Sequence, residues 1–262
     1  MLVILSFAEL FLMVSCKPIV PAIPQTNPAV LLHQLRPEID AAIARVLDSG
    51  RYILGEEVAA FEREWATWCG VEYAVGCANG TDGLELILRA LDLPLGARVL
   101  APSHTAVATI AALVRAGCRP YLADVDFLSY TLDLESAARC LEAAVAEGDP
   151  IKALIAVHLY GHPCDLEGLQ ELCSYHGVSL LEDASQAHGA RWGGQRVGGF
   201  GVAAAFSLYP TKNLGALGDA GVVITSDGAL AKRMVQLRQY GWQQPAISEE
   251  PGINSRLDPL QA

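Results

Sequence analysis

The sequence predicts an α/β fold, a three-layer α/β/α sandwich around a mostly parallel sheet of seven strands. Strand-like and helix-like segments alternate along most of the chain. The strand candidates are short, continuous apolar runs rather than alternating ones, which is typical of parallel strands buried on both faces. Hydrophobic residues make up 52% of the 262 residues and charged residues 18%, so the chain can bury a sizeable core.

The elements can be placed in order along the chain. Helical periodicity predicts a first helix over 37–49, closed by Gly50, and a second helix over 56–69. Seven strands are expected over 73–78, 98–101, 119–125, 153–159, 179–182, 203–208 and 221–225. Further helices are expected over 83–91, 106–116, 134–147, 166–176 and 229–240.

The two ends of the chain differ from this core. Residues 1–16 form an apolar N-terminal extension without the basic start of a signal peptide, and it is too short for a comfortable membrane span. A mis-set start codon would explain these residues, and export as a lipoprotein is the alternative. Residues 17–50 read as a proline-rich arm and a helix, and residues 51–262 as one large domain. The chain stops at Ala262 without a cap or polar tail, as a fragment would.

Charge and cysteine usage exclude several classes of function. Lys and Arg number 18 against 29 Asp and Glu, and the net charge of −11 disfavours a nucleic-acid binder. An anionic ligand must therefore be held by local geometry. Seven scattered cysteines without a CxxC pair indicate reduced thiols in a cytoplasmic protein. No metal site is predicted, because His162 and Cys164 lack a partner pair at ligand spacing.

Ligands of open α/β sheets bind where the strands end, so the residues after each strand are the candidates for chemistry. After the first strand, Gly80, Thr81 and Asp82 begin a helix and offer backbone N–H groups to a phosphate. An ordinary helix cap is the alternative, and no P-loop or dinucleotide pattern is present. His104 follows the second strand, where a structural hydrogen bond is the simpler interpretation.

Two later strand ends carry an acid and an amine. The pair Glu182-Asp183 closes a buried strand, where a carboxylate needs a partner such as a metal or a protonated heterocyclic nitrogen. Gln186 follows three residues later. Lys212 lies in a loop rich in hydroxyls and glycines and can bind an aldehyde, although most lysines are simply exposed. A phosphate cradle, a strand-end Asp and a loop Lys are what pyridoxal phosphate needs.

From Lys17 to Ala262 the sequence resembles the DegT/DnrJ/EryC1/StrS aminotransferases, which act mostly on nucleotide-linked keto-sugars. The segments that carry the resemblance are 50–55, 78–82, 102–105, 182–190, 207–214 and 252–256. The resemblance implies the large domain of the aspartate-aminotransferase fold, known as fold type I of the pyridoxal phosphate enzymes. It also implies a homodimer with sites across the interface, and a C-terminal small domain that this chain lacks.

The resemblance further implies roles for the strand-end residues around pyridoxal 5′-phosphate. Lys212 would bind the cofactor covalently and shuttle the proton, Asp183 would pair with the ring nitrogen, and Gln186 would lie near the phenolic oxygen. The reaction would move an amino group from a donor, with glutamate expected, to a keto-sugar. The product would serve the biosynthesis of amino sugars, surface polysaccharides or antibiotic sugars.

The implied phosphate site combines both subunits. Backbone groups of Thr81 and Asp82 would hold the phosphate together with Ser207. Asn254, or nearby Arg256, would reach the phosphate in the other subunit.

The sequence departs from the family pattern at Ala106, where many members carry an aromatic ring that stacks on the cofactor, and His104 is the candidate substitute. A few relatives replace the lysine by His and catalyse dehydration, so Lys212 favours transamination over a sugar dehydratase. An inactive or regulatory cofactor-binding fragment is the remaining alternative.

Overall fold

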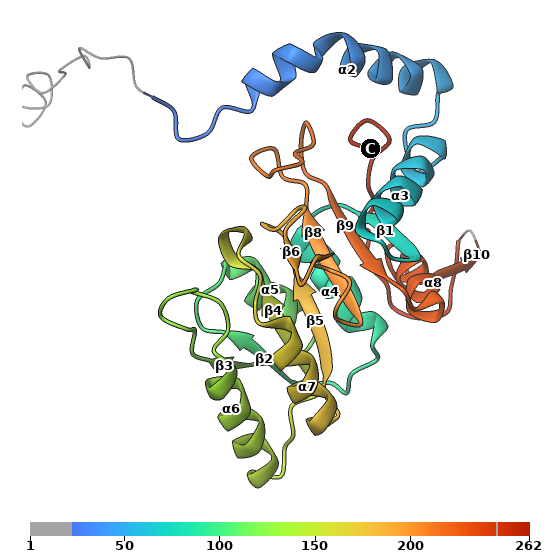
Figure 1. The fold of residues 1–262 in the computed structure, drawn as a ribbon. Coiled ribbons are helices and arrows are strands. Elements are labelled where there is room, and N and C mark those ends of the chain that lie inside the picture. The colour runs from blue at the N-terminus through green and yellow to red at the C-terminus, as the bar shows by residue number, and fades with distance from the viewer. Residues whose placement is uncertain (1–22, 245) are drawn as a thin grey trace, which may run out of the picture.

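The computed structural model describes residues 23–244 and 246–262 (Figure 1). The apolar extension over 1–16 and the first part of the predicted arm lie outside the described residues. Residues 23–27 contain no helix or strand, in keeping with their proline content.

One seven-stranded sheet forms the centre of the molecule, with the strand order β1-β9-β8-β5-β4-β2-β3. All its neighbouring strands run parallel except β9, which is antiparallel to both β1 and β8. The prediction of a mostly parallel sheet of seven strands is therefore confirmed. The strands are β1 (Tyr73–Cys77), β2 (Arg98–Pro102), β3 (Arg119–Ala123), β4 (Ala153–Val157), β5 (Ser179–Asp183), β8 (Ala203–Ser207) and β9 (Gly221–Thr225).

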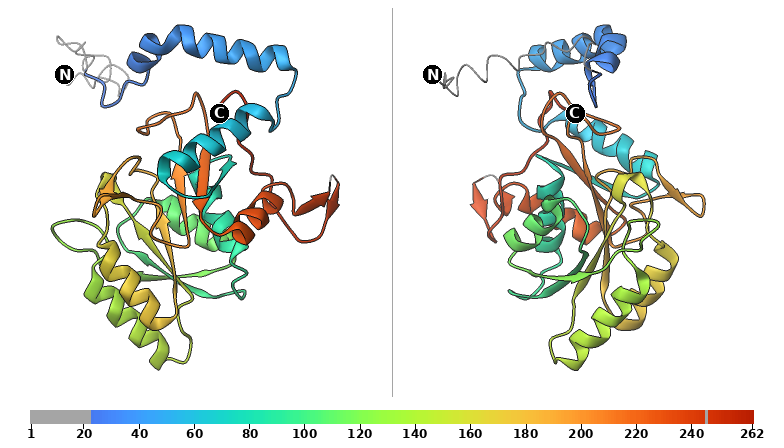
Figure 2. Two further views of the ribbon diagram at one scale, coloured as in Figure 1. Left: turned by 45° about the vertical axis from the view of Figure 1, so that its right-hand side comes forward. Right: turned by 90° about the vertical axis from the view of Figure 1, so that its left-hand side faces the viewer.

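Helices cover both faces of the sheet, which confirms the three-layer sandwich (Figure 2). One face packs against α4 (Gly80–Ala90), α5 (Val107–Arg115) and α8 (Gly228–Leu237). The other packs against α3 (Glu56–Cys69), α6 (Leu134–Ala146) and α7 (Leu166–His176). Successive strand residues alternate between the two cores, so Leu180 joins the α3 side and Leu181 the α4 side. Burial on both faces explains the unbroken apolar runs.

Helix α2 (Ala29–Ser49) begins earlier than the sequence predicts and contains Pro37 in its interior. The prediction of a start at residue 37 was wrong because proline is common in the first turn of a helix. An interior proline removes one backbone hydrogen bond, but its φ angle is already helical. Gly50 ends the helix in the left-handed conformation, with φ at 63°, as expected. Apart from Val46, the side chains described on α2 are not fully buried.

Smaller elements escape the sequence prediction. The expected strand over 153–159 ends at Val157, because a 3₁₀ turn (Leu159–Gly161) follows it. Two short ladders pair β6 (Arg191–Trp192) with β7 (Gln195–Arg196) and β10 (Trp242–Gln244) with β11 (Ile247–Ser248). Within the described ranges, no helix has the length and apolar character needed to cross a membrane.

Candidate active site

A cavity of about 430 Å³ opens at the end of the sheet where the parallel strands finish. Its walls come from the segments that follow β1, β2, β4, β5 and β8. The predicted site residues that line it are Gly80, Thr81, Asp183, Gln186, Ser207 and Lys212. The structure thus brings together side chains that are far apart in the sequence.

The start of α4 forms one wall of this cavity. Asn79 caps the helix, and its side-chain oxygen accepts the N–H of Asp82 at 2.8 Å. Gly80 and Thr81 line the cavity, and the first N–H groups of a helix have no partner within the helix. A side chain on Gly80 would come within 2.9 Å of the Ser207 Cβ and 3.0 Å of the Ser185 Oγ. Only glycine fits between these serines, and two hydroxyls meet a helix N-terminus at this point, which is favourable for an anion.

Asp183 ends β5 on the α4 side of the sheet and is 5% exposed. Its Oδ2 accepts the hydroxyl of Thr109 at 2.8 Å, and its Oδ1 accepts the N–H of Ser185 at 3.2 Å. The remaining lone pairs of a carboxylate can accept a donor from the cavity. Sequence reasoning missed both Thr109 and Ser185, since an isolated Thr in a helix or Ser in a turn has no distinctive pattern.

Lys212 lies in the loop after β8, partly exposed at the cavity wall. Among the described residues, its Nζ takes part in no ion pair. His188 lies on the α3 side, packed against the rings of Trp65 and Phe206. Burial lowers the pKa of His188 to about 4, and the charge of Lys212 acts in the same direction. Lys212 is therefore an amine beside a neutral imidazole.

Gln186 is oriented by the backbone of the 3₁₀ turn after β4. Its Oε1 accepts the N–H of Tyr160 at 2.7 Å. Tyr160 adopts a left-handed backbone conformation with φ at 57°, which presents this N–H to the glutamine. Since the oxygen is engaged, the Nε2 end of Gln186 is the one left to donate to a ligand.

Three predicted residues lie outside the cavity wall. Asp82 turns away, and its carboxylate pairs with Arg115 at 2.9 Å. His104 is exposed, with its Nε2 3.4 Å from the hydroxyl of Tyr160. Asn254 is exposed in an isolated β-bridge. Ala106 lines the cavity and His104 does not, and the ligand roles of Asp82, His104 and Asn254 stay predictions.

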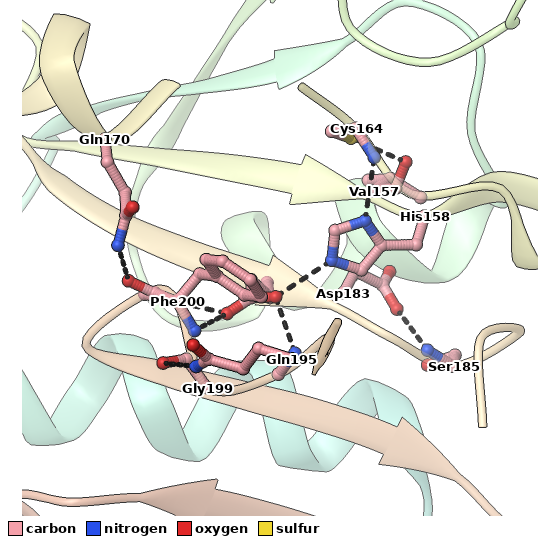
Figure 3. A network of polar contacts seen from close by, with 12 residues as sticks. Val157, His158, Cys164, Gln170, Asp183, Ser185, Gln195, Gly199 and Phe200 are labelled. Atoms are coloured by element: carbon pink, nitrogen blue, oxygen red, sulfur yellow. Dashed lines mark hydrogen bonds and ion pairs between the residues drawn. The ribbon is translucent and has the colours of Figure 1, made fainter. Parts of the chain in front are cut away.

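Glu182, next to Asp183, lies on the opposite face and is fully buried. Its Oε2 accepts from His158 Nε2 at 3.0 Å and from the N–H of Gly198 at 2.6 Å. Its Oε1 accepts the N–H groups of Phe200 at 2.8 Å and Gly201 at 2.7 Å (Figure 3). Burial opposes ionisation, but these donors outweigh it and hold the pKa of Glu182 below its usual range. Glu182 thus needs neither a metal nor a heterocyclic ligand.

His158 connects this network to the next strand. Its Nδ1 faces the N–H of Cys164 at 3.1 Å (Figure 3). A backbone N–H can only donate, so Nδ1 is the acceptor, and the proton on Nε2 is donated to Glu182. The buried pair thereby joins the end of β4, the end of β5 and the turn before β8.

The cysteines in the described part of the chain show no sign of a reactive thiol. Its six cysteines are free, and five of them are buried. Burial raises the pKa of Cys69, Cys77 and Cys173 to about 12, which suppresses the thiolate. Over 23–244 and 246–262, no group of three or more His, Cys, Asp or Glu side chains is arranged to hold a metal ion.

The sequence is similar to those of known proteins. The chain is 46% identical over 242 residues to the dTDP-3-amino-3,4,6-trideoxy-α-D-glucose transaminase of Streptomyces venezuelae. It is 42% identical over 241 residues to the UDP-N-acetyl-3-dehydro-α-D-glucosamine 3-aminotransferase of Acidithiobacillus ferrooxidans. In each case 92% of this chain is covered, against 62% and 64% of the relative. The chain therefore spans less than two thirds of the length of these relatives.

The fold agrees with solved structures. The crystal structure of DesV from S. venezuelae, in complex with a ketimine intermediate, matches with a TM-score of 0.88 at 45% identity. The match covers 92% of this chain and 64% of DesV. This likeness confirms the predicted fold type I architecture. The family model for DegT/DnrJ/EryC1/StrS aminotransferases matches residues 33–262, and the chain belongs to that family.

Proposed function

We propose that residues 51–262 form the cofactor-binding domain of a pyridoxal phosphate-dependent aminotransferase that acts on a nucleotide-linked keto-sugar. Aminotransferases of this family depend on pyridoxal phosphate. The observation that carries the proposal is a single cavity with three features in its wall. They are the close approach of Gly80 to Ser207, here called the Gly80–Ser207 cradle, the carboxylate of Asp183 and the amine of Lys212.

The cavity residues fit the chemistry of the cofactor. The helix N-terminus and the hydroxyls of Ser185 and Ser207 suit a phosphate. The buried carboxylate of Asp183 suits a protonated ring nitrogen, and the Nε2 of Gln186 suits the phenolic oxygen. Lys212 supplies the amine that binds an aldehyde. The negative charge of the whole chain is no obstacle, because this phosphate site consists of local N–H and hydroxyl donors.

The residues of this chain divide the work of transamination. The cofactor, when bound, supplies an electron sink beside the reacting carbon. Asp183 keeps the ring nitrogen protonated, which maintains that sink. The Nζ of Lys212 removes a proton from the amine-bearing carbon of the donor and, in the reverse half, returns one to the sugar carbon that receives nitrogen. The α4 N-terminus and the two serines hold the phosphate in place during both halves.

The relatives support the choice of substrate. One acts on a dTDP-linked sugar and another on a UDP-linked sugar, and both names place the amine on carbon 3. We therefore propose a nucleotide-linked 3-keto-sugar as acceptor and glutamate as donor, in the cytoplasm. The product would enter amino-sugar, polysaccharide or antibiotic-sugar biosynthesis.

We also propose that two copies of the chain associate beside the cavity. Large apolar side chains are exposed there, including Val107 next to the cavity residue Ala106 and Tyr160 next to Leu159. Val107 is 83% exposed and Tyr160 72% exposed. An apolar rim of this kind favours contact with another protein surface. A symmetric partner would also offer its Asn254 or Arg256 to a cavity that lacks its own.

Lys212→Ala tests the assignment. Borohydride reduction of the cofactor-loaded wild type should remove the visible band and raise the intact mass by one reduced cofactor. Lys212→Ala should show no such mass gain, and its conversion of glutamate to 2-oxoglutarate should fall at least about a hundredfold, since the proton carrier is lost.

Lys152→Ala is the matched control, because Lys152 is an exposed lysine at the opposite end of β4. It should keep both the mass gain and the reaction. An undiminished mass gain in Lys212→Ala would contradict the proposal. Cofactor attached at Lys212 without any amine transfer would instead favour a regulatory cofactor-binding protein.

A further inference from the structure

Behind Asp183, two threonines form a chain of hydroxyl groups that leads from the cavity to the carboxylate. The Oγ1 atoms of Thr105 and Thr109 are 2.8 Å apart, and the Oγ1 of Thr109 is 2.8 Å from Asp183 Oδ2. Thr105 lines the cavity, whereas Thr109 is 0% exposed. These contacts connect the start of α5 to the end of β5, which lies 74 residues away in the sequence.

The direction of each hydrogen bond follows from the chemistry of the groups. An ionised carboxylate only accepts, so Thr109 must use its single hydroxyl proton on Asp183. The oxygen of Thr109 is then an acceptor, and Thr105 must donate to it. Hydrogen bonds in such a chain polarise one another, which strengthens the bond to the charged end.

Thr109 is well placed to fix the carboxylate in one orientation. It lies in the first turn of α5, where its own N–H donates to Ala106 O at 3.1 Å. A branched side chain in a helix has few accessible rotamers. Among the described residues, Thr109 provides the side-chain hydrogen bond to Asp183, and the other contact is the N–H of Ser185 at 3.2 Å.

We propose that Thr109, supported by Thr105, is a positioning residue that aims Asp183 at the ring nitrogen of the cofactor. This inference rests on the proposed function, because it assumes that Asp183 pairs with that nitrogen. Without the hydroxyl, the carboxylate can rotate about its terminal torsion, which is a broad and soft one. The pairing with the nitrogen would then lose alignment, although Asp183 itself remains.

The test uses two cofactors that differ only at the ring nitrogen. Thr109→Val keeps the shape of the side chain and removes its hydroxyl. Its dissociation constant for pyridoxal phosphate should rise on the order of tenfold, the value of one hydrogen bond to a charged group. Its affinity for the 1-deaza analogue, in which C–H replaces the nitrogen, should change less than about twofold, because that analogue has nothing for Asp183 to pair with.

Thr109→Ser is the rescue variant and should restore the wild-type affinity for both cofactors. An equal loss for both cofactors in Thr109→Val would mean a purely structural role, and no loss for either would mean no role at all. Each result overturns the inference. Thr109→Ala replaces the valine variant if that protein does not fold, and the same selective loss is expected.

Borohydride labelling of the wild type separates the proposed function from the proposed role of Thr109. If the wild type gains no cofactor mass at Lys212 under borohydride, the proposed function fails before Thr109 is examined. If the wild type is labelled and Thr109→Val does not discriminate between the cofactors, only the positioning role fails.

Discussion

Glu182 and Asp183 are neighbours in the sequence, yet they lie on opposite faces of the sheet in different surroundings. Glu182, on the α3 side, accepts four hydrogen bonds from the protein, one from His158 and three from backbone N–H groups. Asp183, on the α4 side, accepts two and borders the cavity. Both are at most 5% exposed, so burial alone does not separate them.

The difference lies in the number of donors that the protein itself provides. A carboxylate has about four lone-pair positions, and those of Glu182 are all used. Glu182, whose acceptor positions are all occupied, holds together the strand ends and the turn over 198–201. Asp183, whose acceptor positions are not all occupied, can still accept a hydrogen bond from a ligand. Counting internal donors thus distinguishes a structural from a functional carboxylate where the sequence shows only Glu-Asp.

Glu182→Gln should have the largest effect on folding. The amide keeps one acceptor oxygen but turns an NH₂ group toward backbone donors that cannot accept. At least two buried N–H groups then lose their partner, and the free energy of unfolding should fall by about 4 kcal/mol. Urea denaturation followed by circular dichroism measures this loss. If the free energy of unfolding changes by less than about 1 kcal/mol, Glu182 is not the structural carboxylate described here.

Acid sensitivity should also originate on the α3 side, at His188. Its pKa is about 4 in the folded protein because it is buried beside Lys212, against an ordinary value of 6.5. The unfolded chain therefore binds the proton first as the pH falls. Stability is fully present above pH 6.5 and declines toward pH 4, by on the order of 3 kcal/mol.

His188→Phe supplies the control for this titration. The variant should flatten the stability curve between pH 6.5 and 4, because phenylalanine does not titrate. Denaturation midpoints measured at half-unit pH steps give the difference between the two curves. Parallel curves for the variant and the wild type would assign the acid sensitivity to other groups.

Asp183→Asn should have the smallest effect on stability and still strongly reduce activity. Asparagine keeps the shape, its oxygen can accept the N–H of Ser185, and its NH₂ can donate to the hydroxyl of Thr109, which accepts as well as donates. The free energy of unfolding should therefore change by less than about 1 kcal/mol. Amine transfer should fall by about a hundredfold, because the charge next to the ring nitrogen is lost. A stability loss as large as that of Glu182→Gln would show that both carboxylates are structural.

Sequence reasoning predicted the scaffold and part of the site for physical reasons. Buried parallel strands appear in the sequence as continuous apolar runs. Because the carboxyl ends of parallel strands meet at one edge of the sheet, the sequence predicts that Gly80, Asp183 and Lys212 lie close together. The alternation of strand residues places Glu182 and Asp183 on opposite faces, but it does not say which face holds the cavity. That choice depends on the helices that pack on each side.

The remaining features depend on contacts between distant segments. Thr109 gains its role from a carboxylate on another element, and no local pattern marks it. The sequence offers Asp82 as part of a phosphate site but does not show its contacts with Arg115 and Asn79, which come from other segments or from the helix cap. Pro37 was misread because local preference favours a helix start, whereas the chain continues a helix through it.

The position of β9 has a consequence for how the protein folds. This antiparallel strand separates β1 from β8, and Tyr73 of the first strand in the sequence pairs with Thr225 of the last strand of the sheet. During synthesis β1 remains without its partner until β9 has emerged, after the other five strands of the sheet have been made. Such long-range pairing slows folding and leaves an apolar strand open to aggregation. The Gly80–Ser207 cradle, which needs both strands in place, should accordingly be among the last parts of the molecule to form.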